Sequence, residues 1–115
     1  MRIAPAILAA LCSLSAFAGG YTAWAVPTRI DVVRQEGFMV YGTFGNPGGC
    51  SIGDQFFVAY GTVQYSQIYA TLLAALTAGK PIMVYSGSCT PVAWYTVAST
   101  TYNTVTSSEA VSISN

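Results

Sequence analysis

Few side chains of this protein have the types and spacing that covalent catalysis requires. The sequence has no histidine, so it cannot contain a Ser-His-Asp or Cys-His relay. Asp31, Glu36 and Asp54 could imitate the carboxylate pair of a glycosidase, but they fall on different expected elements and no motif fixes their separation. We therefore expect a protein that is not an enzyme and that uses no cofactor.

Aromatic and hydroxyl side chains indicate a different chemistry, the binding of sugars. A sugar site joins an aromatic face to a few short polar groups that satisfy the hydroxyls. Tyr85 and Ser86 end one expected strand, and Trp94 with Tyr95 lies in the next. These four residues would form a glycan site if the two strands pair, whereas burial of Trp94 and Tyr85 in the core is the alternative.

Two of the three cysteines are expected to form a disulfide. Cys50 and Cys89 lie on either side of the one stretch with a helical pattern, while Cys12 falls in the N-terminal leader. A zinc site is the alternative, but without histidine it would need carboxylates at unsuitable spacing. A Cys50–Cys89 bond would restrict the unfolded chain by roughly 4 kcal/mol on the entropy model.

The first 25 residues have the pattern of a secretory signal peptide. Met1 and Arg2 precede a run, residues 3–18, that is apolar apart from two serines. Small-x-small cleavage sites end at Ala18 and at Ala25, and we favour cleavage after Ala25, which makes residues 1–25 the leader and residues 26–115 one domain. The leader is too short to span a bilayer, and we expect a secreted or periplasmic protein without a membrane span.

Charge is scarce after residue 25. Three basic residues (Arg29, Arg34, Lys80) and four acidic residues (Asp31, Glu36, Asp54, Glu109) give a net charge of minus one. No basic patch is present, so we expect no binding of nucleic acid. So little charge offers little repulsion between copies, which favours a homo-oligomer.

β-branched and aromatic runs predict a mainly β domain. Residues 28–34 and 38–44 should form a hairpin across the turn at Gln35-Glu36-Gly37, with Gly37 in a positive-φ conformation. Further strands are expected at residues 52–60, 81–86 and 92–97, with a last edge strand at 110–113.

One amphipathic helix is expected over residues 65–78. Apolar side chains recur there at steps of three and four residues. Gly79 is suited to the left-handed conformation that ends a helix, and Pro81 prevents its continuation.

The order of three strands, a helix and two strands is that of the OB-fold. In that five-stranded Greek-key barrel, the helix lies between strands three and four. The predicted fold is therefore mainly β with one helix: a small OB-fold-like barrel with one disulfide. An antiparallel sheet covered by a helix is the competing architecture.

The central segment resembles the B subunit of subtilase cytotoxin and its bacterial relatives. The resemblance rests on Gly49-Cys50-Ser51, on a helix with Tyr69 and Leu72, and on the run from Thr77 to Tyr85, in which Thr-x-Gly-x-Pro leads into a strand that ends in tyrosine. It implies an OB-fold subunit that assembles into a ring of five, binds sialylated or related cell-surface glycans, and in true toxins carries a separate enzymatic A subunit.

Two positions depart from the pattern of that family. Ser86 stands where the family's strand continues with a second tyrosine, and Thr28 is the counterpart of the hydroxyl residue that contacts the sugar. The resemblance thus adds Thr28 to the predicted glycan-binding residues Tyr85, Ser86, Trp94 and Tyr95. The predicted function is a secreted, glycan-binding, toxin-B-like subunit, and the alternative is a structural or protein-interaction domain of the bacterial envelope.

Overall fold

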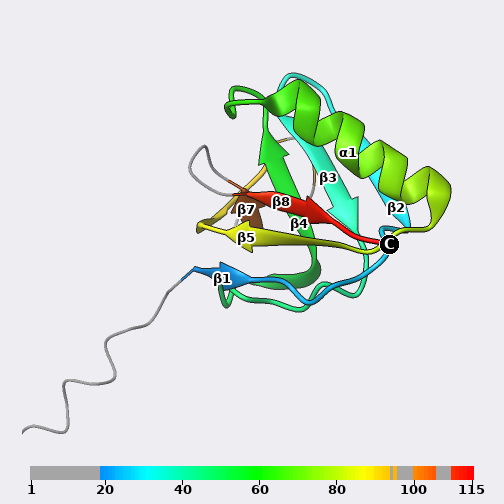
Figure 1. Ribbon diagram of the computed structural model, residues 1–115. Helices are drawn as coiled ribbons and strands as arrows, with labels where there is room; N and C mark the ends of the chain where they lie inside the picture. The colour runs from blue at the N-terminus through cyan, green and yellow to red at the C-terminus, as the bar shows by residue number, and fades with distance from the viewer. Residues whose placement is uncertain (1–18, 94, 96–99, 106–109) are drawn as a thin grey trace, which may run out of the picture.

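The computed structural model describes residues 19–93, 95, 100–105 and 110–115. The described strands form two sheets, with the order β2-β3-β4-β7-β6 in the larger and β1-β5-β8 in the smaller, and Figure 1 shows their arrangement. The elements are β1 Gly20–Tyr21, β2 Arg29–Val33, β3 Gly37–Tyr41, β4 Ile52–Ala59, α1 Tyr65–Ala78, β5 Ile82–Ser86, β6 Ser88–Thr90, β7 Tyr102–Val105 and β8 Val111–Ile113.

The predicted hairpin is present as β2 and β3, which pair antiparallel from Arg29↔Tyr41 to Val33↔Gly37. Gly37 has a φ of 143°. A Cβ at this position would lie 2.1 Å from the carbonyl oxygen of Val58. The turn therefore requires glycine both for its backbone conformation and for the close approach of β4.

The predicted helix is confirmed with the expected bounds. Gly79 follows α1 with a φ of 69°, and the amide of Lys80 donates to the carbonyl of Ala75 at 3.0 Å. The left-handed glycine thus ends the helix as the sequence predicted. This described helix is shorter and less apolar than a membrane crossing would require.

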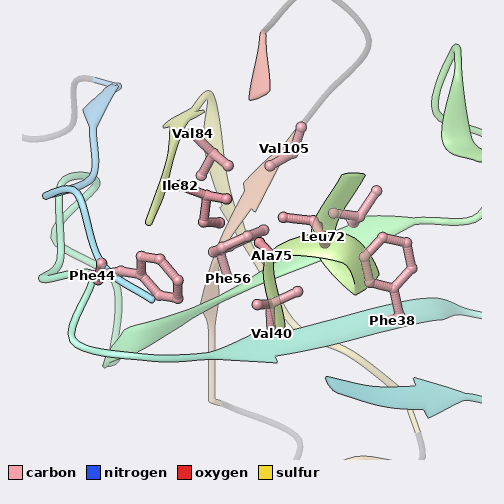
Figure 2. Close-up of a cluster of buried hydrophobic side chains, with 11 residues drawn as sticks. Phe38, Val40, Phe44, Phe56, Leu72, Ala75, Ile82, Val84 and Val105 are labelled. Atoms are coloured by element: carbon pink, nitrogen blue, oxygen red, sulfur yellow. The ribbon is translucent and has the colours of Figure 1, made fainter. Parts of the chain in front are cut away.

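The main core lies between the larger sheet, α1 and the smaller sheet. Figure 2 shows its side chains, which come from β3, β4, α1, β5 and β7 and from the segments that contain Ala25 and Phe44. The Phe38 ring is tilted against Tyr65 and edge-on to Tyr69 of the helix, at centroid distances of 5.3 and 5.1 Å. The buried members are Ala25, Phe38, Val40, Phe44, Phe56, Val58, Leu72, Ala75, Ile82, Val84 and Val105.

A second, smaller apolar cluster covers the opposite face of the larger sheet. Its buried members are Val33, Met39, Phe57, Val92 and Tyr102. Successive side chains of a strand point to opposite faces, which is why Met39 and Phe57 lie here while Phe38 and Phe56 lie in the main core. The two faces are called the outer face and the inner face below, the inner face being the one that α1 covers.

The predicted disulfide joins Cys50 to Cys89, with Cα atoms 5.5 Å apart. It links the segment before β4 to β6, with 39 residues of separation. The bond ties together the two ends of the segment that contains α1.

The strands do not close into a barrel in the part of the chain that the structure describes. β5 pairs with β1 and β8 instead of extending the larger sheet, so two sheets result and the expected OB-fold is not confirmed. Within the described residues the fold is mainly β with one helix and one disulfide, and the larger sheet is not purely antiparallel, because β4 and β7 pair in parallel.

The predicted strand at residues 92–97 is wrong for the three of its residues that the structure describes. Val92, Ala93 and Tyr95 belong to no strand, and Trp94, Thr96 and Val97 lie outside the described residues. The place beside β4 is taken by β7, which pairs with it in parallel. Strand preference reflects packing on a pleated surface, and here Val92 instead packs over the outer face.

Residues 19–25, which we assigned to the leader, include β1 of the smaller sheet. Gly20 and Tyr21 pair with Ser86 and Tyr85. Ala25 forms two backbone hydrogen bonds with Ile82, at 3.0 and 2.9 Å. A chain cleaved after Ala25 would lose this strand, whereas a chain cleaved after Ala18 would keep it.

Candidate functional site

A group of interacting polar and aromatic side chains lies on the outer face, at the edge of the larger sheet. Arg29 and Asp31 are two residues apart on β2, so both point to this face. Tyr41 lies opposite Arg29 on β3. We call Arg29, Asp31, Tyr41 and Tyr95 the tyrosine–carboxylate cluster.

Arg29 and Asp31 form a two-point ion pair. The guanidinium Nε donates to Oδ1 of Asp31 at 2.9 Å, and Nη2 donates to Oδ2 at 2.8 Å. The same guanidinium lies 4.5 Å from the centre of the Tyr41 ring, where the negative face of the ring attracts it. The carboxylate and the ring therefore hold Arg29 in place from two sides.

Tyr95 connects the ion pair to the apolar cluster below it. Its hydroxyl donates to Oδ2 of Asp31 at 2.7 Å and contacts the hydroxyl of Tyr41. Its ring stands edge-on to Tyr102 at 5.8 Å. One end of this side chain is thus packed and the other is polar, an arrangement common for tyrosine at binding surfaces.

These contacts fix the charges of the cluster at neutral pH. The hydrogen bonds from Arg29 lower the pKa of Asp31, and they outweigh the opposing effect of partial burial. Burial raises the pKa of Tyr95 strongly, and the hydrogen bonds with Tyr41 and Asp31 raise it further. Asp31 is therefore ionised beside the Arg29 guanidinium and Tyr95 keeps its proton, so the cluster presents an ion pair together with the Tyr95 hydroxyl.

A shallow groove lies elsewhere on the outer face. Its volume is about 450 Å³. Hydroxyl groups and one carboxylate line it over an apolar floor, and two of the hydroxyls, on Thr90 and Thr104, lie 2.6 Å apart. The residues are Glu36, Phe57, Ala59, Gly61, Thr62, Ser88, Thr90, Pro91, Thr104 and Val105.

Of the predicted glycan residues, Tyr95 and Thr28 lie near the cluster. Thr28 precedes β2 and is exposed. Its hydroxyl donates to the backbone carbonyl of Tyr41 at 3.3 Å. Both residues thus contact Tyr41. Tyr95 contacts the hydroxyl of Tyr41, and Thr28 contacts its backbone carbonyl.

Tyr85 and Ser86 lie in the smaller sheet, apart from the cluster. Tyr85 is half-buried and stands edge-on to the exposed Tyr21 at 5.0 Å. Ser86 is fully buried, and its hydroxyl donates to Oδ1 of Asn103 at 2.9 Å. Direct contact between a sugar and the Ser86 side chain would therefore require the fold to open. Trp94 lies outside the described residues.

The sequence argument missed three members of the cluster. Arg29, Asp31 and Tyr41 were not among the predicted glycan residues, and Asp31 was considered only as half of a glycosidase-like carboxylate pair. Opposite charges two residues apart on an expected strand were the available signal, because such residues share a face.

The other carboxylates serve different parts of the chain. Asp54 has a φ of 59°, and its Oδ1 accepts a hydrogen bond from the amide of Gly45 at 2.8 Å, which holds the loop before β4. Glu36 lines the groove. Within the described ranges, no group of three or more potential metal ligands is gathered.

Comparison with known proteins gives no relative on which to base a function. The chain matches no family model, no curated protein and no solved structure. Function is therefore inferred from the chemistry of the cluster and from the sequence.

Proposed function

We propose that this chain is an exported glycan-binding domain whose sugar site is the tyrosine–carboxylate cluster. The single observation that carries the proposal is the convergence of Tyr41, Tyr95 and Asp31 on one accessible face. Phenol rings offer apolar surface to the C–H groups of a sugar, and the fixed carboxylate and hydroxyls offer partners for sugar hydroxyls.

Export is supported by two features. The leader pattern of the first 25 residues predicts passage into a secreted or periplasmic location. The Cys50–Cys89 bond fits an oxidising compartment, where disulfides form and persist. The domain is small, and such a bond adds stability that a small core lacks.

The proposal also includes a relationship to bacterial toxin B subunits. That connection, with its OB-fold, its ring of five and its separate A subunit, rests on the resemblance of the segment from Cys50 to Tyr85. The tyrosine–carboxylate cluster lies wholly outside that segment, so an experiment can contradict the sugar site without contradicting the toxin likeness.

A glycan array probed with the oxidised, folded chain tests the proposal. We expect binding to a defined set of sugars, and we expect Tyr95→Ala and Asp31→Asn to weaken it at least tenfold because each removes a contact group. Tyr60→Ala is the matched control, since Tyr60 is a 67% exposed tyrosine outside the cluster. Binding that survives both cluster variants, or a silent array, would contradict the proposal.

A protein-interaction domain of the bacterial envelope is the second candidate. It is supported by an apolar surface to which Val32, Tyr60 and Tyr65 contribute, with Val32 69% exposed. Exposed apolar surface of this kind is common at contacts between proteins. A silent glycan array together with loss of a protein contact in Tyr60→Ala would favour this function.

A further inference from the structure

Strand β2 forms an open edge of the larger sheet. It is the first strand in the order β2-β3-β4-β7-β6, and its only described neighbour is β3. An open strand edge presents unpaired amide and carbonyl groups that another strand can bind. β2 is also the longest edge strand of either sheet, with five residues against two in β1 and three each in β6 and β8.

Two hydrogen bonds show which way the backbone amides and carbonyls of β2 point. One is made by Tyr41, the last residue of β3, and the other by Gly42, the residue after it. The amide of Gly42 donates to Asp54, toward β4, while the carbonyl of Tyr41 accepts from Thr28, toward β2. Because backbone groups alternate in direction along a strand, Tyr41, Met39 and Gly37 face β2. Their opposite residues Arg29, Asp31 and Val33 face β3, which leaves Ile30 and Val32 with outward-facing backbone groups.

The side chains of β2 divide in the same way between the two faces. Arg29 and Asp31 lie on the outer face in the ion pair. Ile30 packs in part against the main core, whereas Val32 is 69% exposed. An apolar side chain this exposed on an open edge leaves surface that a second strand could cover.

We propose that two copies of this chain associate through β2, antiparallel, with Ile30 of each copy opposite Ile30 of the other on a two-fold axis. This register places Arg29 opposite Asp31 of the partner subunit and Asp31 opposite Arg29 of the partner subunit. Two arginines and two aspartates then alternate across the junction on the outer face. The contact is the same on both copies, so it closes as a dimer.

The charges of β2 favour this register over registers whose two-fold axis lies at Asp31 or Val32. An axis at Asp31 would place two carboxylates directly opposite each other, and like charges in that position destabilise a strand pair. An axis at Val32 would place Asp31 opposite Val33 of the partner subunit, with no charge partner. The register centred on Ile30 gives every charge of β2 an opposite charge across the junction.

The dimer joins the two outer faces into one surface. The tyrosine–carboxylate clusters of both copies then lie side by side next to the junction. Under the proposed function, this arrangement would let one dimer hold two sugar residues of a branched or clustered glycan at once. The pairing itself does not depend on that function.

Light scattering on the oxidised chain, without sugar and over a series of concentrations, tests the pairing. We expect twice the chain mass at high concentration and a shift to monomer on dilution. Asp31→Arg should be monomeric because it places only positive charges at the junction. The double variant Arg29→Asp with Asp31→Arg should restore the dimer, because the exchanged charges again oppose each other.

Two further variants separate edge pairing from a general charge effect. Glu36→Arg makes the same change of charge outside β2 and should leave the dimer intact. Val32→Pro removes an outward-facing amide that β3 does not use, so a monomer with unchanged circular dichroism is expected. A monomer at every concentration, a mass other than two chains, such as the ring of five that the toxin likeness implies, or a dimer that persists in Asp31→Arg would overturn the proposal. Because no sugar is present, failure of the glycan proposal would leave this result unaffected.

Discussion

The two faces of the larger sheet are built from alternate residues of the same strands, yet they differ in how deeply the rest of the chain buries them. On the inner face, Phe38, Phe56 and Val58 are fully buried under α1 and the smaller sheet. On the outer face, Met39 and Phe57 are covered by a thinner layer that includes Val92. The rest of that face carries charges, hydroxyls and phenols.

The difference shows where this small domain can bind something. Over β3 and β4 the inner face is closed by its own chain, so the side chains there serve stability. The outer face is covered only in part, and its polar groups are held by one another, as in the ion pair of Arg29 and Asp31. The main core therefore lies on one side of the sheet, and the polar groups of the proposed sugar site lie on the other.

The largest predicted loss comes from removing the cover that residues 19–25 give to the inner face. A chain that starts at Val26 lacks β1 and uncovers Ile82 and Val84, which are fully buried, at a cost of about 1.5–3 kcal/mol for each side chain. Chemical denaturation of chains starting at Gly19 and at Val26 measures this loss. N-terminal sequencing of the exported protein would show which form exists, and equal stability of the two would refute the role of β1.

A substitution inside the main core should come next. Phe56 is fully buried and stands edge-on to Phe44 at 5.1 Å. Phe56→Ala should lower the free energy of unfolding by about 3–5 kcal/mol, because it removes apolar contacts and leaves a cavity. Leu73→Ala is the control on the exposed side of α1, where Leu73 is 42% exposed and the loss should be much smaller.

The disulfide should contribute less to the free energy of unfolding than these core contacts, and its contribution should not depend on how either face of the sheet is packed. Replacing both Cys50 and Cys89 by serine should cost about 2–4 kcal/mol, since the unfolded chain regains the freedom of the closed loop. Denaturation of the wild type with and without a reducing agent gives an independent value. If reduction leaves the unfolding midpoint in place, the bond has no such role.

The smallest effect is expected at the outer face and depends on pH. The pKa of Asp31 is lowered by Arg29, so its ion pair stabilises the fold above the unfolded pKa of about 3.9. That contribution is lost as the pH falls through the lower folded value. For an exposed pair it should stay below about 1 kcal/mol.

Denaturation of the wild type and of Asp31→Asn across the acid range measures this contribution. The difference between the two proteins should be constant near neutral pH and shrink below about pH 4. A difference that grows as the pH falls would mean that Asp31 is not held ionised by Arg29. Because Asp31 lies on the outer face, neither outcome should change the stability that the main core provides on the inner face.

Local sequence patterns were sufficient for the parts of the fold that form within short segments. The helical spacing over residues 65–78 and the stop at Gly79 predicted α1 with its bounds. The turn at Gly37 predicted the hairpin, because glycine alone suits its backbone. Cys50 and Cys89 predicted their bond because no other pair of cysteines remained after the leader.

The candidate site was less accessible to the same reasoning. Tyr95 was expected to bind sugar, but beside Tyr85 and Ser86, and β5 carries those two residues into the other sheet. The neighbours that Tyr95 meets, Asp31 and Tyr41, are 64 and 54 residues away along the chain. No local pattern connects such distant residues.

Within the residues that the structure describes, the sequence by itself determined the helix α1, the hairpin of β2 and β3, and the Cys50–Cys89 bond, in a mainly β chain with few charges. Only the tertiary structure decided that β7 pairs in parallel with β4, that β5 joins β1 and β8, and that Ser86 is buried while Tyr95 reaches Asp31. The physical reason is that helices and turns depend on neighbouring residues. Strand pairing depends on which distant segments together bury the most apolar surface.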